Sequence, residues 1–159
     1  MNTVRNKGTC VRKISWKDVE NIYDILSVLE GYSVGLAFRN ITNQDIELLE
    51  KPNSILKDLN SLDKFKDYIE VNGQFHSFFP GKCGNDFLLD LVKGIRHRVY
   101  RYRFLGITIP GHIEEYILDH EAIVEAIKEE DPARAEEVMK QHLQRAKKIL
   151  ADSLRQFVM

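Results

Sequence analysis

The chain of 159 residues has the length of one ordinary domain, and its hydrophobic share of 43% is too high for an intrinsically disordered protein. Its 23 lysines and arginines nearly balance 24 aspartates and glutamates, which argues against a nucleic-acid or membrane surface as the partner of the chain as a whole. No apolar run reaches the roughly 20 residues that a membrane helix needs. Cys10 and Cys83 stand in no metal-binding spacing, so we expect a reduced, cytoplasmic chain.

The hydrophobic periodicity is helical along almost the whole chain, and strand-like alternation occurs only near residues 9–14. Apolar residues at helical spacing predict six helices, at about residues 15–38, 42–59, 63–79, 86–105, 112–129 and 131–156. The connections between them are short, and the chain has no repeats or long linkers. We therefore expect an all-α fold, an antiparallel bundle of six or seven helices with a central pocket.

Local signals indicate where several of these helices begin and end. Ser15 with Asp18 resembles a capping box, Thr42 is a second N-cap, and Asp131–Pro132 combines an N-cap with a proline at the first helical position. Pro52 should kink or break the second helix, and Pro80–Gly81 should end the third. Gly84–Asn85 then offers a cap for the fourth helix.

Three of the predicted helices carry an apolar stripe that a histidine interrupts, at His76, His120 and His142. A single inward histidine is most often a hydrogen-bonded core residue. Burying three imidazoles costs desolvation unless each finds a partner, and one metal ion would satisfy all three. Asn72, one turn before His76, could supply an oxygen as the fourth ligand. His97 and His112 lie off the stripes, and we expect both to be solvated.

The histidines stand in recognisable segments: Phe75–His76, DHEAIVEAI at 119–127 and DPARAEEVMKQHL at 131–143. Together with LEGYSVGLAFRNITNQDIELLE at 29–50 and GNDFLLDLVKGIRHR at 84–98, they resemble the FCD ligand-binding domain of GntR-family bacterial transcription regulators. The resemblance covers residues 15 to about 150. It implies an effector-sensing domain, not an enzyme, that is usually dimeric and follows a winged helix-turn-helix that binds operator DNA.

Many members of that family hold a divalent metal that helps to bind a small carboxylate effector. Carried onto this sequence, the family's ligand positions are Asn72, His76, His120 and His142. Zinc is the metal that we expect, with nickel and manganese as alternatives, because all three accept imidazole and amide ligands. The stripe that we expect to be buried on the fourth helix consists of Leu88, Leu91, Ile95 and Tyr102. The family's arginine on this helix corresponds to Arg98, which lies within about 60° of Ile95, at the edge of that stripe, and is expected to pair with the effector's carboxylate.

The sequence departs from the family in two places. Ser27 stands where the family often has an arginine, three residues before Glu30. The segment KGTCVRKIS at 7–15 resembles the last wing strand and linker of the winged helix, so we expect residues 1–14 to be a remnant of that region and 15–159 to be the effector-binding domain. Operator DNA and a homodimer partner are then expected, with DNA bound only through the absent winged-helix domain and no membrane contact.

Other interpretations remain open at this point. The basic and aromatic run KGIRHRVYRYR at 93–103 is compatible with a nucleic-acid surface or with a solvated helix face. Three protein ligands with an open position could also activate water, as in a metallohydrolase. Asp119 and Glu121 flank His120 but point about 100° away from it on a helix, which weakens that reading. A purely structural dimerisation bundle is the third alternative.

Overall fold

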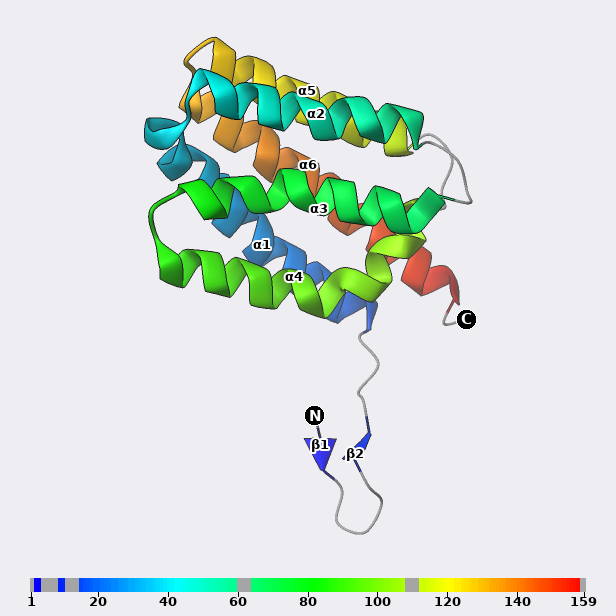
Figure 1. Cartoon of the computed structure of the whole chain (residues 1–159). Coiled ribbons are helices and arrows are strands. Elements are labelled where there is room, and N and C mark those ends of the chain that lie inside the picture. Colours follow the sequence, from blue (N-terminus) through cyan, green and yellow to red (C-terminus); the bar gives the residue numbers. More distant parts are fainter. Residues whose placement is uncertain (1, 4–8, 11–14, 60–63, 108–111, 158–159) are drawn as a thin grey trace.

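The computed structural model describes residues 2–3, 9–10, 15–59, 64–107 and 112–157. Within them, six α-helices form a bundle: α1 (Trp16–Ala37), α2 (Asn43–Asp58), α3 (Phe65–Lys82), α4 (Asp86–Ile107), α5 (His112–Lys128) and α6 (Pro132–Phe157). A short 3-10 helix, η1 (Phe38–Asn40), joins α1 to α2. The two-residue strands β1 (Asn2–Thr3) and β2 (Thr9–Cys10) pair antiparallel (Figure 1). The expected all-α bundle is confirmed.

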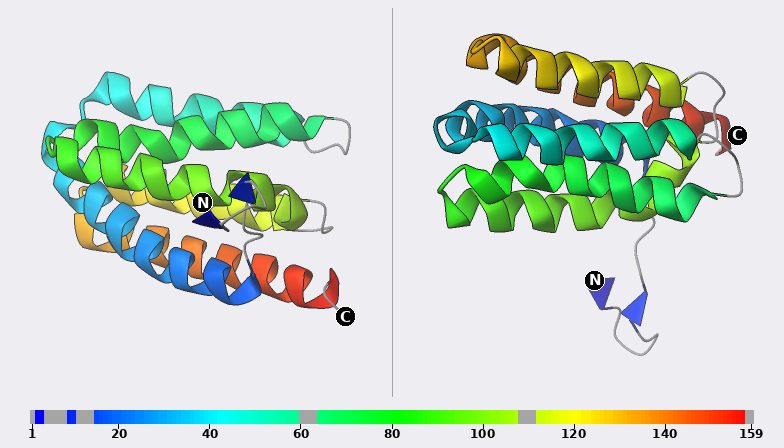
Figure 2. Two further views of the ribbon diagram at one scale, coloured as in Figure 1. Left: turned by 90° about the horizontal axis from the view of Figure 1, so that it is seen from below. Right: turned by 45° about the horizontal axis from the view of Figure 1, so that its top comes forward.

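The helices run side by side along one long axis (Figures 1 and 2). α6 packs against α1 and α5, and α3 packs against α1, α2 and α4. α2 also contacts α5. The three helices that carry the stripe histidines, α3, α5 and α6, therefore all border the interior of the bundle. None of the described helices is long and apolar enough to cross a membrane.

The predicted helix starts are confirmed by their hydrogen bonds. The backbone N–H of Asp18 donates to Ser15 Oγ at 3.1 Å, and that of Ser15 donates to Asp18 Oδ2 at 2.9 Å. The same reciprocal pair joins Thr42 and Asp45 at the start of α2. The N–H of Arg134 donates to Asp131 Oδ1 at 2.9 Å, as an N-cap requires.

Pro80 does not end the third helix as expected, and Pro52 does not break the second. α2 runs unbroken through Pro52, and α3 continues past Pro80 to Lys82. A proline removes one intrahelical hydrogen bond, but both side chains are buried in the bundle, so packing holds the helices together. α3 ends at Lys82, and the chain then turns at Gly84, whose φ of +72° suits glycine. Asn85 Oδ1 accepts from the N–H of Leu88 at the start of α4.

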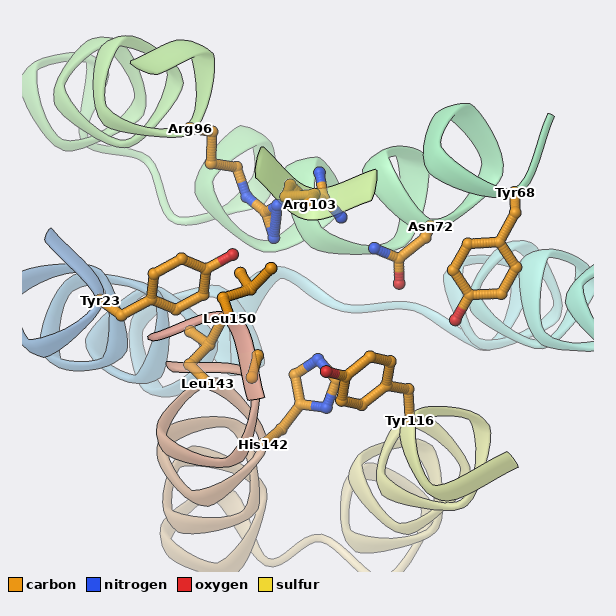
Figure 3. A pocket seen from close by; sticks show the side chains of 10 residues that line it. Tyr23, Tyr68, Asn72, Arg96, Arg103, Tyr116, His142, Leu143 and Leu150 are labelled. Atoms are coloured by element: carbon orange, nitrogen blue, oxygen red, sulfur yellow. The ribbon is translucent and has the colours of Figure 1, made fainter. Parts of the chain in front are cut away.

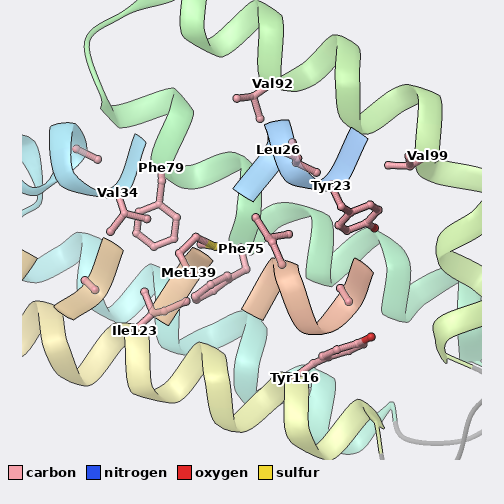
Figure 4. Packing of buried hydrophobic residues seen from close by; sticks show 14 of the residues in the cluster. Tyr23, Leu26, Val34, Phe75, Phe79, Val92, Val99, Tyr116, Ile123 and Met139 are labelled. Carbon is pink, nitrogen blue, oxygen red and sulfur yellow. The ribbon is translucent and has the colours of Figure 1, made fainter. Parts of the chain in front are cut away.

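Apolar side chains from all six helices form the main core (Figure 4). Phe75 and Phe79 of α3 lie at its centre with ring centroids 5.5 Å apart, and Met139 and Ile123 reach them from α6 and α5 (Figure 4). Phe75 also stacks on the His120 ring at 3.9 Å. The core thus packs directly against the polar residues that follow.

Candidate metal centre and ligand pocket

The three stripe histidines meet in the interior. His76, His120 and His142 are 1%, 0% and 3% exposed. The Nε2 atom of His76 lies 3.3 Å from that of His120 and 3.2 Å from that of His142. Nitrogens bound to one ion at about 2.1 Å, with angles of 90–110°, are about 3.0–3.4 Å apart. Two of the three pairs therefore have the spacing of ligands of a single metal, and one ligand nitrogen from each of the three rings lies within 4.8 Å of the other two.

In each imidazole, the Nδ1 atom contacts a side-chain oxygen that can accept a hydrogen bond. The Nδ1 atom contacts Glu30 Oε2 at 2.7 Å in His76, Asn53 Oδ1 at 3.1 Å in His120, and Asp119 Oδ2 at 3.2 Å in His142. Because these oxygens accept, Nδ1 carries the hydrogen, and the lone pair of each Nε2 faces the other two rings. Such outer contacts are typical of histidines that bind metal.

The electrostatics of the site favour neutral imidazoles. Burial lowers the pKa of His76 and His120 well below the usual value, and nearby arginines and histidines lower it further. Burial also lowers the pKa of His142, although the hydrogen bond and charge of Asp119 oppose this shift. Neutral rings are the form that binds a metal cation.

Asn72 lies one turn before His76 on the same face of α3. It is 6% exposed, and its Oδ1 atom is buried with no hydrogen-bond partner in the part of the chain that the structure describes. A buried carbonyl oxygen without a partner is costly. Figure 3 shows the Asn72 amide directed into the same space as the His142 ring. An oxygen ligand at this position fits the three nitrogens.

A cavity of about 30 Å³ adjoins the site. Its lining combines aliphatic side chains with three phenols, two guanidinium groups, an amide and an imidazole: Tyr23, Tyr68, Asn72, Arg96, Arg103, Tyr116, His142, Leu143, Ala146 and Leu150 (Figure 3). Arg96 and Arg103 also line a wider groove of about 480 Å³ between α3 and α4. The two arginines therefore lie between the cavity and the outer groove.

The two cavity arginines differ in their partners. Arg96 donates from Nε to Glu30 Oε1 at 2.7 Å and from Nη2 to Glu30 Oε2 at 3.2 Å. Glu30 is fully buried and contacts both Arg96 and His76. Arg103 has no ion-pair partner among the described residues, and burial lowers its pKa. An arginine in this position favours an anion in the cavity.

The structure does not place Arg98 at the site. Its side chain is exposed, and it does not line the cavity, so the expectation that it reaches the pocket is corrected in favour of Arg96 and Arg103. Of the stripe expected on α4, Leu88 is buried and Ile95 and Tyr102 pack against the core, but Leu91 is half-exposed. The side chains that α4 directs inward also include Val92, Arg96, Val99 and Arg103. This spacing of four, three and four was the signal that could have identified both arginines.

The remaining polar residues of interest lie outside the site. His97 is exposed, and half-buried His112 contacts Glu115 at 3.4 Å. Ser27, at the position of the family's arginine, is buried between α1 and α6, where it accepts from Gln144 Nε2 at 2.8 Å. It does not line the cavity.

Residues 21–145, most of the chain, match the family model of the FCD domain. The chain belongs to the FCD domain family. It is 28% identical over 151 residues to the HTH-type transcriptional repressor GlaR of Escherichia coli K12, covering 90% of this chain and 69% of GlaR. It is 25% identical over 137 residues to the HTH-type transcriptional regulator YdhC of Bacillus subtilis 168, covering 86% of this chain and 59% of YdhC. These relatives are regulators, which confirms that the FCD chain is not an enzyme.

Solved structures share the fold. E. coli McbR/YncC aligns with a TM-score of 0.83 and 20% identity over 94% of this chain and 76% of that one. The metal-free FCD domain of TM0439 aligns with a TM-score of 0.75 and 18% identity over 91% and 99% of the two chains. Streptococcus agalactiae GntR gives a TM-score of 0.68 and 22% identity over 82% of this chain but only 58% of that chain.

Proposed function

We propose that this FCD domain is the effector sensor of a GntR-family regulator and that it holds one divalent metal through Asn72, His76, His120 and His142. The observation that carries the proposal is the buried imidazole triad, in which an outer oxygen fixes each Nδ1 and leaves each Nε2 facing inward. The partnerless Asn72 oxygen supports the fourth position. Zinc is the expected metal, with nickel and manganese as alternatives.

The effector that we propose is a small organic acid. The ligand set of one amide and three neutral imidazoles leaves the full positive charge of the ion in place, and a buried cation is costly without an anion. When bound, the metal supplies positive charge and an open position for a carboxylate oxygen. Arg103, which has no ion-pair partner in the described chain, is the second group for the acid; it replaces Arg98 in this role.

The output of the domain is control of operator DNA. In the longer regulator, a winged-helix domain would bind the DNA, and binding of the acid here would change its affinity. Residues 1–14 then correspond to the last wing strand and the linker, and β2 lies within this segment. A cytoplasmic location and a homodimer belong to the same proposal.

An exposed apolar face supports the homodimer. α1 and α4 pack against each other, and both present large apolar side chains to solvent. These are Ile25, Val28, Tyr32, Phe87 and Leu91, which are 55%, 58%, 51%, 91% and 51% exposed. Large apolar side chains exposed on two neighbouring helices are typical of a protein–protein interface. A second copy of the chain is the partner that we propose.

Elemental analysis combined with native mass spectrometry tests the sensor proposal. Protein purified without an affinity tag should contain one metal ion per chain, and small acids should add to its mass. His120→Ala should lose most of the metal, whereas His97→Ala, which changes an exposed histidine outside the site, should keep it. A metal-free wild-type protein would favour the alternative of a purely structural bundle.

A further inference from the structure

One polar group of the cavity has no role in the proposed metal site. Tyr68 is 1% exposed, and its hydroxyl has no hydrogen-bond partner among the described residues. It lines the cavity together with the hydroxyl-bearing side chains of Tyr23 and Tyr116 (Figure 3). A buried hydroxyl without a partner costs roughly 1–3 kcal/mol. The cavity therefore contains a donor that the protein itself does not satisfy.

Tyr68 lies at the end of the cavity away from the triad. Tyr68, Asn72 and His76 follow one another at steps of four along the same face of α3. At 1.5 Å per residue, the backbone of Tyr68 is about 12 Å from that of His76 and about 6 Å from that of Asn72. A small acid bound beside Asn72 would thus extend towards the phenol.

The cavity combines neutral phenol donors with the cationic side chains of two arginines. Burial raises the pKa of both Tyr68 and Tyr116, so each phenol keeps its hydrogen at neutral pH. Arg103 lies close enough to oppose these shifts electrostatically. Donors of this kind match a hydroxyl, carbonyl or carboxylate oxygen on a ligand.

We propose that Tyr68 donates a hydrogen bond to a second oxygen function of the effector and so selects acids that carry one over plain monocarboxylates. This inference rests on the proposed function, because it assumes that an acid occupies the cavity. A site built to hydrogen-bond a polar group on its ligand discriminates against the analogue that lacks it, because the donor is then left unpaired. The effector class is thereby narrowed to small hydroxy, oxo or dicarboxylic acids.

Two pairs of acids that differ by one hydroxyl test this inference: acetate with glycolate, and propionate with lactate. Calorimetric titration of the metal-loaded wild-type protein should show the hydroxy acid binding roughly tenfold more tightly in each pair. Tyr68→Phe should remove that preference and leave the plain acids unchanged. Tyr100→Phe, a half-exposed tyrosine of α4 outside the cavity, is the matched control and should retain it.

The outcomes separate the two proposals. If wild-type protein binds no acid at all, the proposed function fails, and the role of Tyr68 fails with it. If the protein binds both members of each pair equally well, or if Tyr68→Phe weakens both alike, the sensor proposal stands and the selectivity inference is overturned. Without added acid, Tyr68→Phe should unfold at the same temperature as wild type or higher; a lower melting temperature would reveal a protein partner for the hydroxyl and overturn the inference.

Discussion

Asn72 determines the net charge of the proposed metal site, because its side chain is neutral where an aspartate would be negative. Replacing it by aspartate adds one negative charge beside the ion and keeps the oxygen. Because two unit charges about 4 Å apart interact by about 4 kcal/mol at an effective dielectric constant of 20, Asn72→Asp should tighten metal binding and weaken the acid, each by tenfold or more. Chelator competition measures the first effect and calorimetry the second. Equal acid affinity in both proteins would show that charge does not govern recognition.

Asn53 tests the outer contacts of the triad. It accepts from the Nδ1–H of His120 at 3.1 Å, and removing such a partner typically lowers metal affinity by about 10–100-fold. Asn53→Ala should show a loss of this size in a chelator titration. Ser54→Ala, at the neighbouring exposed position of α2, is the control. The outer contact is dispensable if the two variants bind metal equally.

The inward-facing residues of the candidate site could be predicted from the sequence, but the contacts that other helices make with the histidine Nδ1 atoms could not. Asn72 and the three histidines interrupt apolar stripes, so their inward placement followed from helical periodicity alone. Glu30 interrupts the stripe of Tyr23, Leu26 and Val34 in the same manner and could have been found by the same rule. Its contacts with two other helices, like that of Asn53, depend on how the helices pack, which no local pattern encodes.

At the scale of the helices, the cap of α2 gives a direct stability prediction. The N–H of Asp45 donates to Thr42 Oγ1, and Thr42→Ala should lower the free energy of unfolding by about 1 kcal/mol. Thr42→Ser keeps the hydroxyl and should cost much less. Urea denaturation of the three proteins measures the difference; equal losses in both variants would place the effect in packing and not in the cap.

The carboxylate of the same cap adds a pH dependence. Its hydrogen bond with Lys82 is the main cause that lowers the pKa of Asp45 below its ordinary 3.8, and the Thr42 backbone assists. A carboxyl group with a lowered folded-state pKa stabilises the fold above its unfolded pKa, and this contribution is lost as pH falls through the folded value. Asp45→Asn should therefore destabilise the protein at pH 7 and matter less near pH 3, as urea midpoints at the two pH values would show.

Helix starts and helix ends differed in how well the sequence predicted them. The caps at Ser15, Thr42 and Asp131 were correct because each depends on a side chain within three residues of the backbone N–H that it accepts from. Neither Pro52 nor Pro80 interrupts its helix, because burial of a whole helix face outweighs the loss of one backbone hydrogen bond. On α4, Leu91 was expected to be buried but is 51% exposed, because a leucine at helical spacing need not face the core.

For the molecule as a whole, the proposed dimer interface is the feature to test. Leu91→Asp places a charge in the exposed apolar face of α1 and α4, and central interface residues often contribute 2 kcal/mol or more. We expect the dimer dissociation constant to rise by roughly 30-fold or more. Leu118→Asp, at a 63% exposed leucine of α5, should leave it unchanged. Sedimentation equilibrium measures both; an unchanged dimer in Leu91→Asp would contradict the assignment.

Glu30 connects the two proposed ligands, because its carboxylate contacts His76 and Arg96 and also acts electrostatically on Arg103. Two ligands whose protein contacts meet on a shared buried charge are expected to influence each other, and equilibrium thermodynamics makes that influence reciprocal. If the bound metal raises the affinity for the acid by a given factor, the bound acid must raise the affinity for the metal by the same factor. A regulator that contains this domain would then respond to the concentrations of both ligands together. At a low metal concentration it would respond weakly even to a high concentration of the acid.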